Sequence, residues 1–161
     1  QRRGTRKAGG PLHARGTRFH KTGRFMMKTT ADIEHDIYLV AKDYLAGRIG
    51  GSVYKEGTRP RDSAKEDAVI VVSFASTGQR QEASVYVNIF VPDTASGHGE
   101  GMPDKARLQK VASMGEWLAE AVNDTYSDLQ AALGSATGIL EGQGTGQHIV
   151  SIHLTLTINT I

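Results

Sequence analysis

Cysteine is absent from the 161 residues of this sequence. Its absence excludes disulfide bridges, thiolate nucleophiles and cysteine-ligated zinc, and is typical of proteins that work in a reducing compartment. No stretch approaches 18 apolar residues, so the sequence predicts no transmembrane helix, and no apolar segment near its start indicates a secretory signal. The length predicts one domain with an extension.

Acidic residues are missing from the first 28 positions, which hold nine Lys or Arg residues. The other 133 residues carry 10 Lys or Arg against 17 Asp or Glu, a net charge of −7. Five glycines and Pro11 interrupt the basic segment, and its apolar residues follow no helical or strand period. We therefore predict an irregular basic N-terminal arm at residues 1–28 and a single acidic domain at residues 29–161.

Three interpretations of the basic arm are open. It is a solvated extension, an interpretation favoured by the start at Gln1 and by Met26 or Met27 as natural starts before a helix cap. Otherwise it docks onto an acidic protein surface, including another copy of the domain, or it contacts nucleic acid. The candidate contact residues are Arg2, Arg3, Arg6, Lys7, Arg15, Arg18, Lys21 and Arg24.

The first half of the domain has the pattern of one helix and a hairpin. Apolar residues recur every three or four positions over residues 30–47, after possible caps at Thr29 and Thr30 and before a stop at Gly47. A short strand is expected near residues 52–55, followed by a charged loop. Residues 67–75 are a nearly continuous β-branched run, which predicts a strand buried on both faces. Residues 82–91 alternate strictly and predict the partner strand of a hairpin.

The second half predicts a long helix and a closing strand. Pro103 suits a first helical position, and an apolar face continues to about residue 124, with residues 126–133 expected to extend the helix. A loose loop over 134–146 contains a short strand at Ile139-Leu140, and residues 148–158 alternate again. The fold class is α+β, with a four-stranded, mostly antiparallel sheet and two helices packed on one face.

Candidate chemical sites are few. Asp93, His98, Glu100 and Asp104 lie on or beside the glycine-rich loop at Gly97–Gly101, but such groups are common in solvated loops. His148 and His153 are five apart in a strand and point to opposite faces. We therefore predict no catalytic residue, no cofactor and no metal site.

Aromatic residues suggest surface contacts instead of chemistry. Tyr86 and Phe90 lie on the outward phase of residues 82–91, among small polar residues, and are the candidate interface residues. Trp117 is interpreted as core or helix-edge packing, with an interface anchor as the alternative.

The order of these elements resembles that of the tail-completion, or tail-terminator, proteins of tailed bacteriophages and prophages. The segments that carry the resemblance are ADIEHDIYLVAKDYL, DAVIVVSFA, ASVYVNIFVPD, DKARLQKVASMGEWLAEAVND and HIVSIHLTLTI, within residues 29–161. The basic arm has no counterpart in that pattern.

The resemblance implies a structural protein and not an enzyme. It implies a homo-oligomeric ring, commonly of six subunits, that caps the tail tube and joins it to the head. The partners would be other copies, the tail-tube protein and the head connector, and the location would be the virion, assembled in the bacterial cytoplasm. The rival hypothesis is a small nucleic-acid-binding module that uses the arm. An enzyme built on the Gly97–Gly101 loop is the third.

Overall fold

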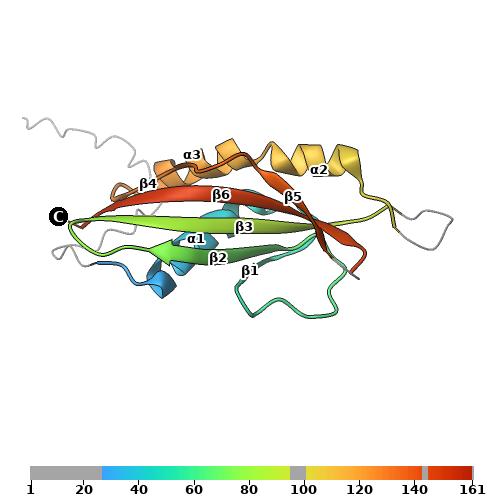
Figure 1. The fold of residues 1–161 in the computed structure, drawn as a ribbon, viewed down its shortest axis with the longest axis horizontal. Helices are drawn as coiled ribbons and strands as arrows, with labels where there is room; N and C mark the ends of the chain where they lie inside the picture. Colours follow the sequence, from blue (N-terminus) through green and yellow to red (C-terminus); the bar gives the residue numbers. More distant parts are fainter. Residues whose placement is uncertain (1–26, 95–100, 143–144, 161) are drawn as a thin grey trace, which may run out of the picture.

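The computed structural model describes residues 27–94, 101–142 and 145–160. Three helices and six strands follow one another along these residues (Figure 1). No helix of the described chain is both long and apolar enough to cross a membrane. The α+β class is confirmed. The elements are α1 (Thr30–Leu45), β1 (Val53–Lys55), β2 (Ala68–Ala75), β3 (Arg80–Pro92), α2 (Lys105–Ala112), α3 (Gly115–Thr125), β4 (Leu129–Leu133), β5 (Gly138–Gly142) and β6 (Gln147–Asn159).

The sheet has six strands, so the prediction of four is wrong. Its order is β1-β2-β3-β6, and both β4 and β5 pair with the far edge of β6. Only β1 and β2 are parallel. The strand β4 was missed because residues 126–133 were expected to be helical. The backbone becomes extended at Tyr126, with φ −114° and ψ 134°, which ends the helix. In the following strand Leu129 and Ala131 are buried while the residue between them is exposed, which is the alternation of a β-strand.

Helix α1 begins where its sequence predicts and ends at Leu45, two residues before the predicted end. Thr29 caps it in a capping box with Asp32, in which each side chain accepts a hydrogen bond from the other residue's backbone amide. Gly47 adopts a positive φ of 75° just after the helix, a conformation that disfavours residues with a side chain. The buried stripe of α1 consists of Ile33, Ile37, Val40, Ala41 and Leu45.

The predicted second long helix is two consecutive helices. Helix α2 begins after Pro103 and is capped by Asp104, whose side chain accepts from the Arg107 amide at 3.1 Å. A short break at Ser113 and Met114 separates it from α3. Both helices contact β6 from the side of the sheet where α1 lies, so the prediction of helices on one face is confirmed.

The strand faces agree with the alternation in the sequence. Val87 of β3 and Leu154 of β6 are fully buried between the sheet and the helices. The expectation for β2 holds only at its start, where Ala68 and Ile70 are buried. The strand then bulges after Val72, and Phe74 is 56% exposed on the helix-free side. Its β-branched run therefore indicated a strand correctly but overestimated how much of it is covered.

Residues 27 and 28 are bound to the domain. The backbone of Lys28 donates to and accepts from the buried side chain of Gln81, at 2.7 and 3.0 Å. The Lys28 amine forms ion pairs with Asp36 and Asp128 and lies over the Tyr126 ring. Burial, together with the negative charges of the two aspartates, raises the pKa of the Tyr126 phenol. The Met27 sulfur also accepts from the Gly78 amide at 3.1 Å, so both residues contact the folded domain through their side chains.

Candidate assembly interface

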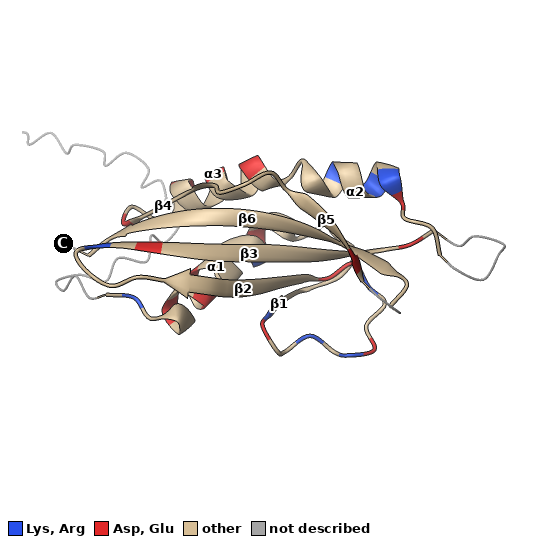
Figure 2. Ribbon diagram, in the orientation of Figure 1, with Lys and Arg blue, Asp and Glu red and all other residues tan. Residues whose placement is uncertain are grey.

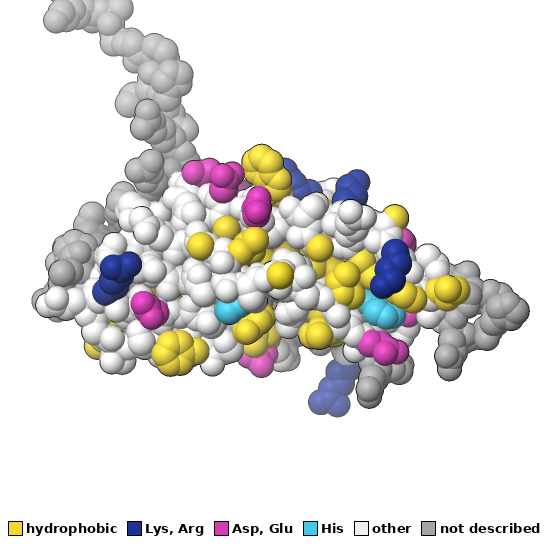
Figure 3. All heavy atoms as spheres, turned by 45° about the horizontal axis from the view of Figure 1, so that its top comes forward, with side chains coloured by type: hydrophobic (Ala, Val, Ile, Leu, Met, Phe, Trp, Pro, Cys, Tyr) yellow, Lys and Arg dark blue, Asp and Glu magenta, His cyan; other side chains and the backbone are white. Residues whose placement is uncertain are grey.

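The helix-free side of the sheet, here called the outer face, is wide and uncharged at its centre. Charged residues on the strands of this face are confined to its ends, where Arg80 and Glu82 lie at the start of β3 (Figure 2). In space filling, the centre shows uncharged and hydrophobic side chains with acids and bases around the margin (Figure 3). The central positions, paired across β2, β3 and β6, are Val71, Phe74, Ser84, Tyr86, Asn88, Ser151, His153 and Thr155.

Tyr86 and His153 form the aromatic centre of the outer face. Their rings stack with centroids 4.5 Å apart and planes 10° from parallel. The two imidazole nitrogens of His153 lie 3.1 Å from the hydroxyls of Ser84 and Ser135. These contacts fix the His153 ring, so that a flat surface carries both an aromatic face and polar groups able to bind water or a partner.

A glycine allows the chain to pass close to His153. Gly134, which follows β4, donates its amide to the carbonyl of His153 at 2.9 Å. A Cβ atom at this position would lie 2.7 Å from the His153 ring and 2.6 Å from the Thr155 methyl group. Any larger residue there would displace the outer-face cluster, which explains why this strand connection needs glycine.

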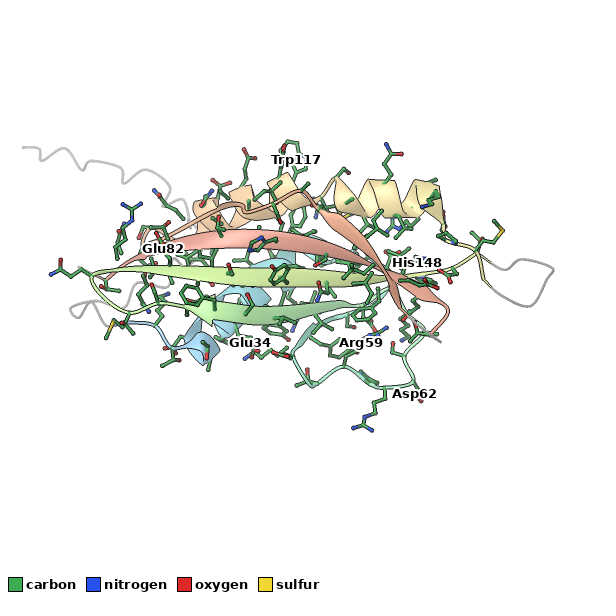
Figure 4. All side chains as sticks on the ribbon, in the orientation of Figure 1. Glu34, Arg59, Asp62, Glu82, Trp117 and His148 are labelled. Atoms are coloured by element: carbon green, nitrogen blue, oxygen red, sulfur yellow. The ribbon has the colours of Figure 1, made fainter. Side chains whose placement is uncertain are left out.

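Phe90, the second predicted interface residue, lies under Arg59 of the loop between β1 and β2. The Arg59 guanidinium is 3.9 Å from the centre of the Phe90 ring. Figure 4 shows Arg59 beside the ends of β2 and β3, whereas Asp62 of the same loop points away from the sheet. The structure therefore places Tyr86 in the open centre of the outer face and Phe90 beneath the loop at its margin.

A buried ion pair holds this loop in place. Arg59 Nε donates to the carboxylate of Asp67 at 3.0 Å, and the Asp67 side chain is 0% exposed. The Ser63 hydroxyl and the Ser52 amide donate to the same carboxylate. Arg59 also donates to the Gln147 side chain at 3.1 Å, which ties the loop to β6. Sequence reasoning found the charged loop but not this pairing, because its partners are up to 88 residues apart.

The Asp67 carboxylate is stabilised in its charged form. Burial alone would raise the pKa of this group. Hydrogen bonds from Ser63 and the Ser52 amide, followed by the Arg59 guanidinium, outweigh burial and hold the Asp67 pKa below its ordinary value of 3.8. All groups of the cluster are paired with one another, so the arrangement supports the fold and leaves no acid or base to react.

The groups considered for metal binding do not form a site within the described ranges. Asp93 lies 2.6 Å from the Nδ1 atom of His148, while His98 and Glu100 fall outside the described residues. No group of three or more His, Asp or Glu residues in the described chain could hold a metal ion. His148 lies opposite Val91 and His153 opposite Tyr86, so the two histidines occupy opposite phases of β6, as predicted.

Two shallow grooves flank helix α1. The first, of about 590 Å³, lies between α1 and β1, where the amines of Lys42 and Lys55 approach the Tyr38 ring at 5.7 and 5.3 Å. The second, of about 600 Å³, lies between the end of α1 and α2, beside Arg48 and Lys110. Among the described residues, neither groove is lined by a histidine or a carboxylate.

The remaining predicted contact residues, from Arg2 to Arg24, lie outside the described residues. Trp117 is 63% exposed on α3, so its interpretation as core packing is wrong. A signal for this was present, because Glu116 and Glu120 share the polar phase of the helix with it. A scan against models of known protein families found no match, and a search of the curated proteins found no similar protein.

Proposed function

We propose that this chain is a structural subunit of a tailed bacteriophage or prophage, which caps the tail tube and joins the tail to the head as a ring of identical copies. The observation that carries the proposal is the uncharged outer face with the exposed Phe74 and the half-buried Tyr86. The choice of a tail-capping ring among possible assemblies rests on the element order, which resembles that of tail-terminator proteins.

The outer face has the composition of an interface core. About a quarter of the residues of a typical soluble domain are charged, and most of these lie at its surface. Here the central outer positions of three adjacent strands carry no Lys, Arg, Asp or Glu, while Phe74 and Tyr86 supply aromatic surface. Depletion of charge together with aromatic enrichment is the pattern of surfaces that another protein covers.

The two sides of the domain favour a ring over a simple pair. One side presents an uncharged sheet and the other presents helices, and in the proposed ring the outer face of one copy contacts a different surface of the next. Contacts of this heterologous kind form a closed ring when the rotation between copies closes. The basic arm and the domain of charge −7 are complementary, which lets the arm of one copy reach the acidic surface of its neighbour.

Native mass in solution tests this proposal. The full chain is measured by light scattering at high protein concentration and low salt, where charge attraction is least screened, and imaged by negative-stain electron microscopy. We expect rings whose mass is a multiple of the 17.3 kDa chain, with six copies the expected number. A Phe74→Asp variant should weaken the assembly, whereas Asp62→Asn, on the exposed loop, should not.

A monomer at every concentration would contradict the ring. The rival function, nucleic-acid binding through the arm, is favoured by nine basic residues in a segment without acids. It predicts that the monomer binds DNA or RNA with an affinity that falls steeply with salt, and that removal of residues 1–26 abolishes the binding. The two hypotheses are thus separated by mass and by salt dependence in one set of samples.

A further inference from the structure

The outward surface of α2 and α3 divides into a basic half and an acidic half. The two helices follow one another end to end along one margin of the molecule, with basic side chains on α2 and acidic ones on α3 (Figure 2). Helix α2 contains no acid and helix α3 contains no base. The exposed charges are Lys105 and Lys110 on α2 and Glu116, Glu120 and Asp124 on α3. We call this surface the helix face.

None of these five charges forms an ion pair with another described residue. The third basic residue of α2, Arg107, differs because it is paired with Glu66 and also donates to the carbonyl of Arg48. The charges of the helix face are therefore free to meet groups on another molecule.

Helix stability explains only part of this distribution, because Lys110 in the last turn of α2 and Glu116 in the first turn of α3 suit the helix dipoles whereas the other placements do not. Lys105 is the first residue of α2, at the positive end of the helix dipole, and Asp124 is next to the last residue of α3, at the negative end. Glu116, Glu120 and Asp124 are spaced by four, so that neighbouring carboxylates repel one another along the helix. Each of these placements destabilises an isolated helix, and a surface of opposite charge would relieve all of them.

Trp117 lies near the boundary between the two halves. Its side chain projects from the first turn of α3 and is 63% exposed (Figure 4). Large exposed aromatic residues surrounded by charge are typical of the centre of a protein interface, where the ring is buried and the charges set the orientation. Trp117 is also the only tryptophan of the chain, so its fluorescence reports on this position alone.

We propose that the helix face binds the helix face of a second copy, across a twofold axis that passes near Trp117. In this antiparallel arrangement the basic α2 of each copy faces the acidic α3 of the other, and every attractive pair occurs twice. The charge complementarity within the helix face selects a copy of the same chain as the occupant. A partner of a single charge sign would be attracted to one half and repelled by the other.

This contact is separate from the proposed ring. It uses the helix face, whereas the ring uses the outer face of the sheet, and the two surfaces belong to different elements. Twofold contacts between helix faces would join two copies even if no ring forms, and would pair two rings if one does. Phe74→Asp changes the outer face and leaves the helix face intact, so the helix-face contact is tested apart from the ring.

The first measurement follows Trp117 fluorescence and mass in a Phe74→Asp background, in which we expect ring assembly to be weakened. We expect the emission to shift to the blue with rising protein concentration, together with a change from 17.3 kDa to twice that mass. Salt should oppose both changes, because the helix-face charges are exposed. Emission and mass that stay constant with concentration would overturn the proposal.

The second measurement is a charge exchange between two variants. Variant A carries Lys105→Glu and Lys110→Glu, and variant B carries Glu116→Lys, Glu120→Lys and Asp124→Lys. Each variant alone should dimerise on the order of a hundredfold more weakly, because like charges then face each other twice. Mixed together, the all-acidic helix face of A and the all-basic helix face of B should pair with restored affinity.

Controls keep this test independent of folding. Circular dichroism should show both variants folded, and exchange of Asp43 for Lys, on the exposed part of α1, should leave dimerisation unchanged. Failure of the mixture to pair, with both variants folded, would overturn the twofold arrangement. Pairing through the same charges into open chains of increasing mass would also overturn it, because it would show a head-to-tail contact.

Discussion

The two faces of the central sheet are built from the same strands and follow opposite rules. On β3, Val87 faces the helices and is fully buried, while its neighbour Tyr86 faces outward and is half-buried. The centre of the inner face is apolar because its partner, the helical layer, belongs to the same chain, and the polar Gln81 and His148 lie only toward the ends of the strands. The centre of the outer face is aromatic and polar but carries no charge. Such a composition is expected of a surface that is exposed to water when the chain folds and is covered later by another protein.

The largest contrast between the faces is expected from buried charge. Val87→Asp and Leu154→Asp each place a carboxylate among apolar side chains and should each cost about 3–5 kcal/mol, enough to abolish soluble folding. Ser84→Asp and Thr155→Asp put the same group on the outer face and should cost far less. Urea unfolding of the four variants checks this. Equal losses on both faces would show that the faces are assigned wrongly.

The next largest loss of stability is expected at the margin of the outer face, where Arg59 and Asp67 hold the loop between β1 and β2. Arg59→Ala leaves the carboxylate of Asp67 buried without its ion-pair partner and should lower the unfolding free energy by about 3 kcal/mol. Arg61→Ala, two residues away and exposed, is the matched control and should change it by less than about 0.5 kcal/mol. Chemical unfolding that gave the same result for both would mean that the loop is not held by this pair.

A smaller, pH-dependent effect follows from the same pair. The pKa of Asp67 is lower in the folded chain than its ordinary value of 3.8, so the folded state favours the charged form. Its contribution to stability is complete above about pH 3.8 and is lost as the pH falls through the lower, folded-state pKa. Thermal unfolding between pH 2 and 6 should therefore show a steeper acid loss in the natural chain than in Asp67→Asn. Parallel curves would remove this group as a cause.

The smallest effect should come from removal of the arm. A chain that begins at Met27 keeps the hydrogen bonds of Lys28 to Gln81 and its ion pair with Asp36. Its thermal midpoint should be nearly unchanged, whereas Lys28→Ala in the same shortened chain should lower it. A large decrease on removal of residues 1–26 would mean that the arm packs against the domain.

Most of the fold that could be predicted was predicted from the alternation of apolar and polar residues in the strands. The pattern of residues 82–91 and 148–158 identified β3, β6 and their buried phase, because burial against a helical layer demands an apolar residue at every second position. The strand β4 could not be recognised in the same way. Its residues Ala131 and Ala132 suit a helix as well as a strand, and its place is decided by pairing with β6, twenty-five residues further along.

The candidate interface was predictable only in part. Tyr86 stood out because it lies on the outward phase of a clear strand, and the structure keeps it there beside His153. Phe90 has the same phase, but a loop distant in sequence covers it through Arg59. Such long-range side-chain contacts leave no periodic signal. The charge division between α2 and α3, in contrast, is visible in the sequence once the helix boundaries are known.

The absence of cysteine offers the most direct test of the outer face as an assembly surface. Thr155→Cys introduces the chain's only thiol at an exposed outer position, and its rate of reaction with a thiol reagent reports whether that position is covered. The account predicts at least about tenfold slower labelling in concentrated, low-salt protein than in dilute protein. Adding Phe74→Asp should restore fast labelling at both concentrations. An equal rate for Thr155→Cys in dilute and concentrated samples would contradict the claim that another copy covers this face.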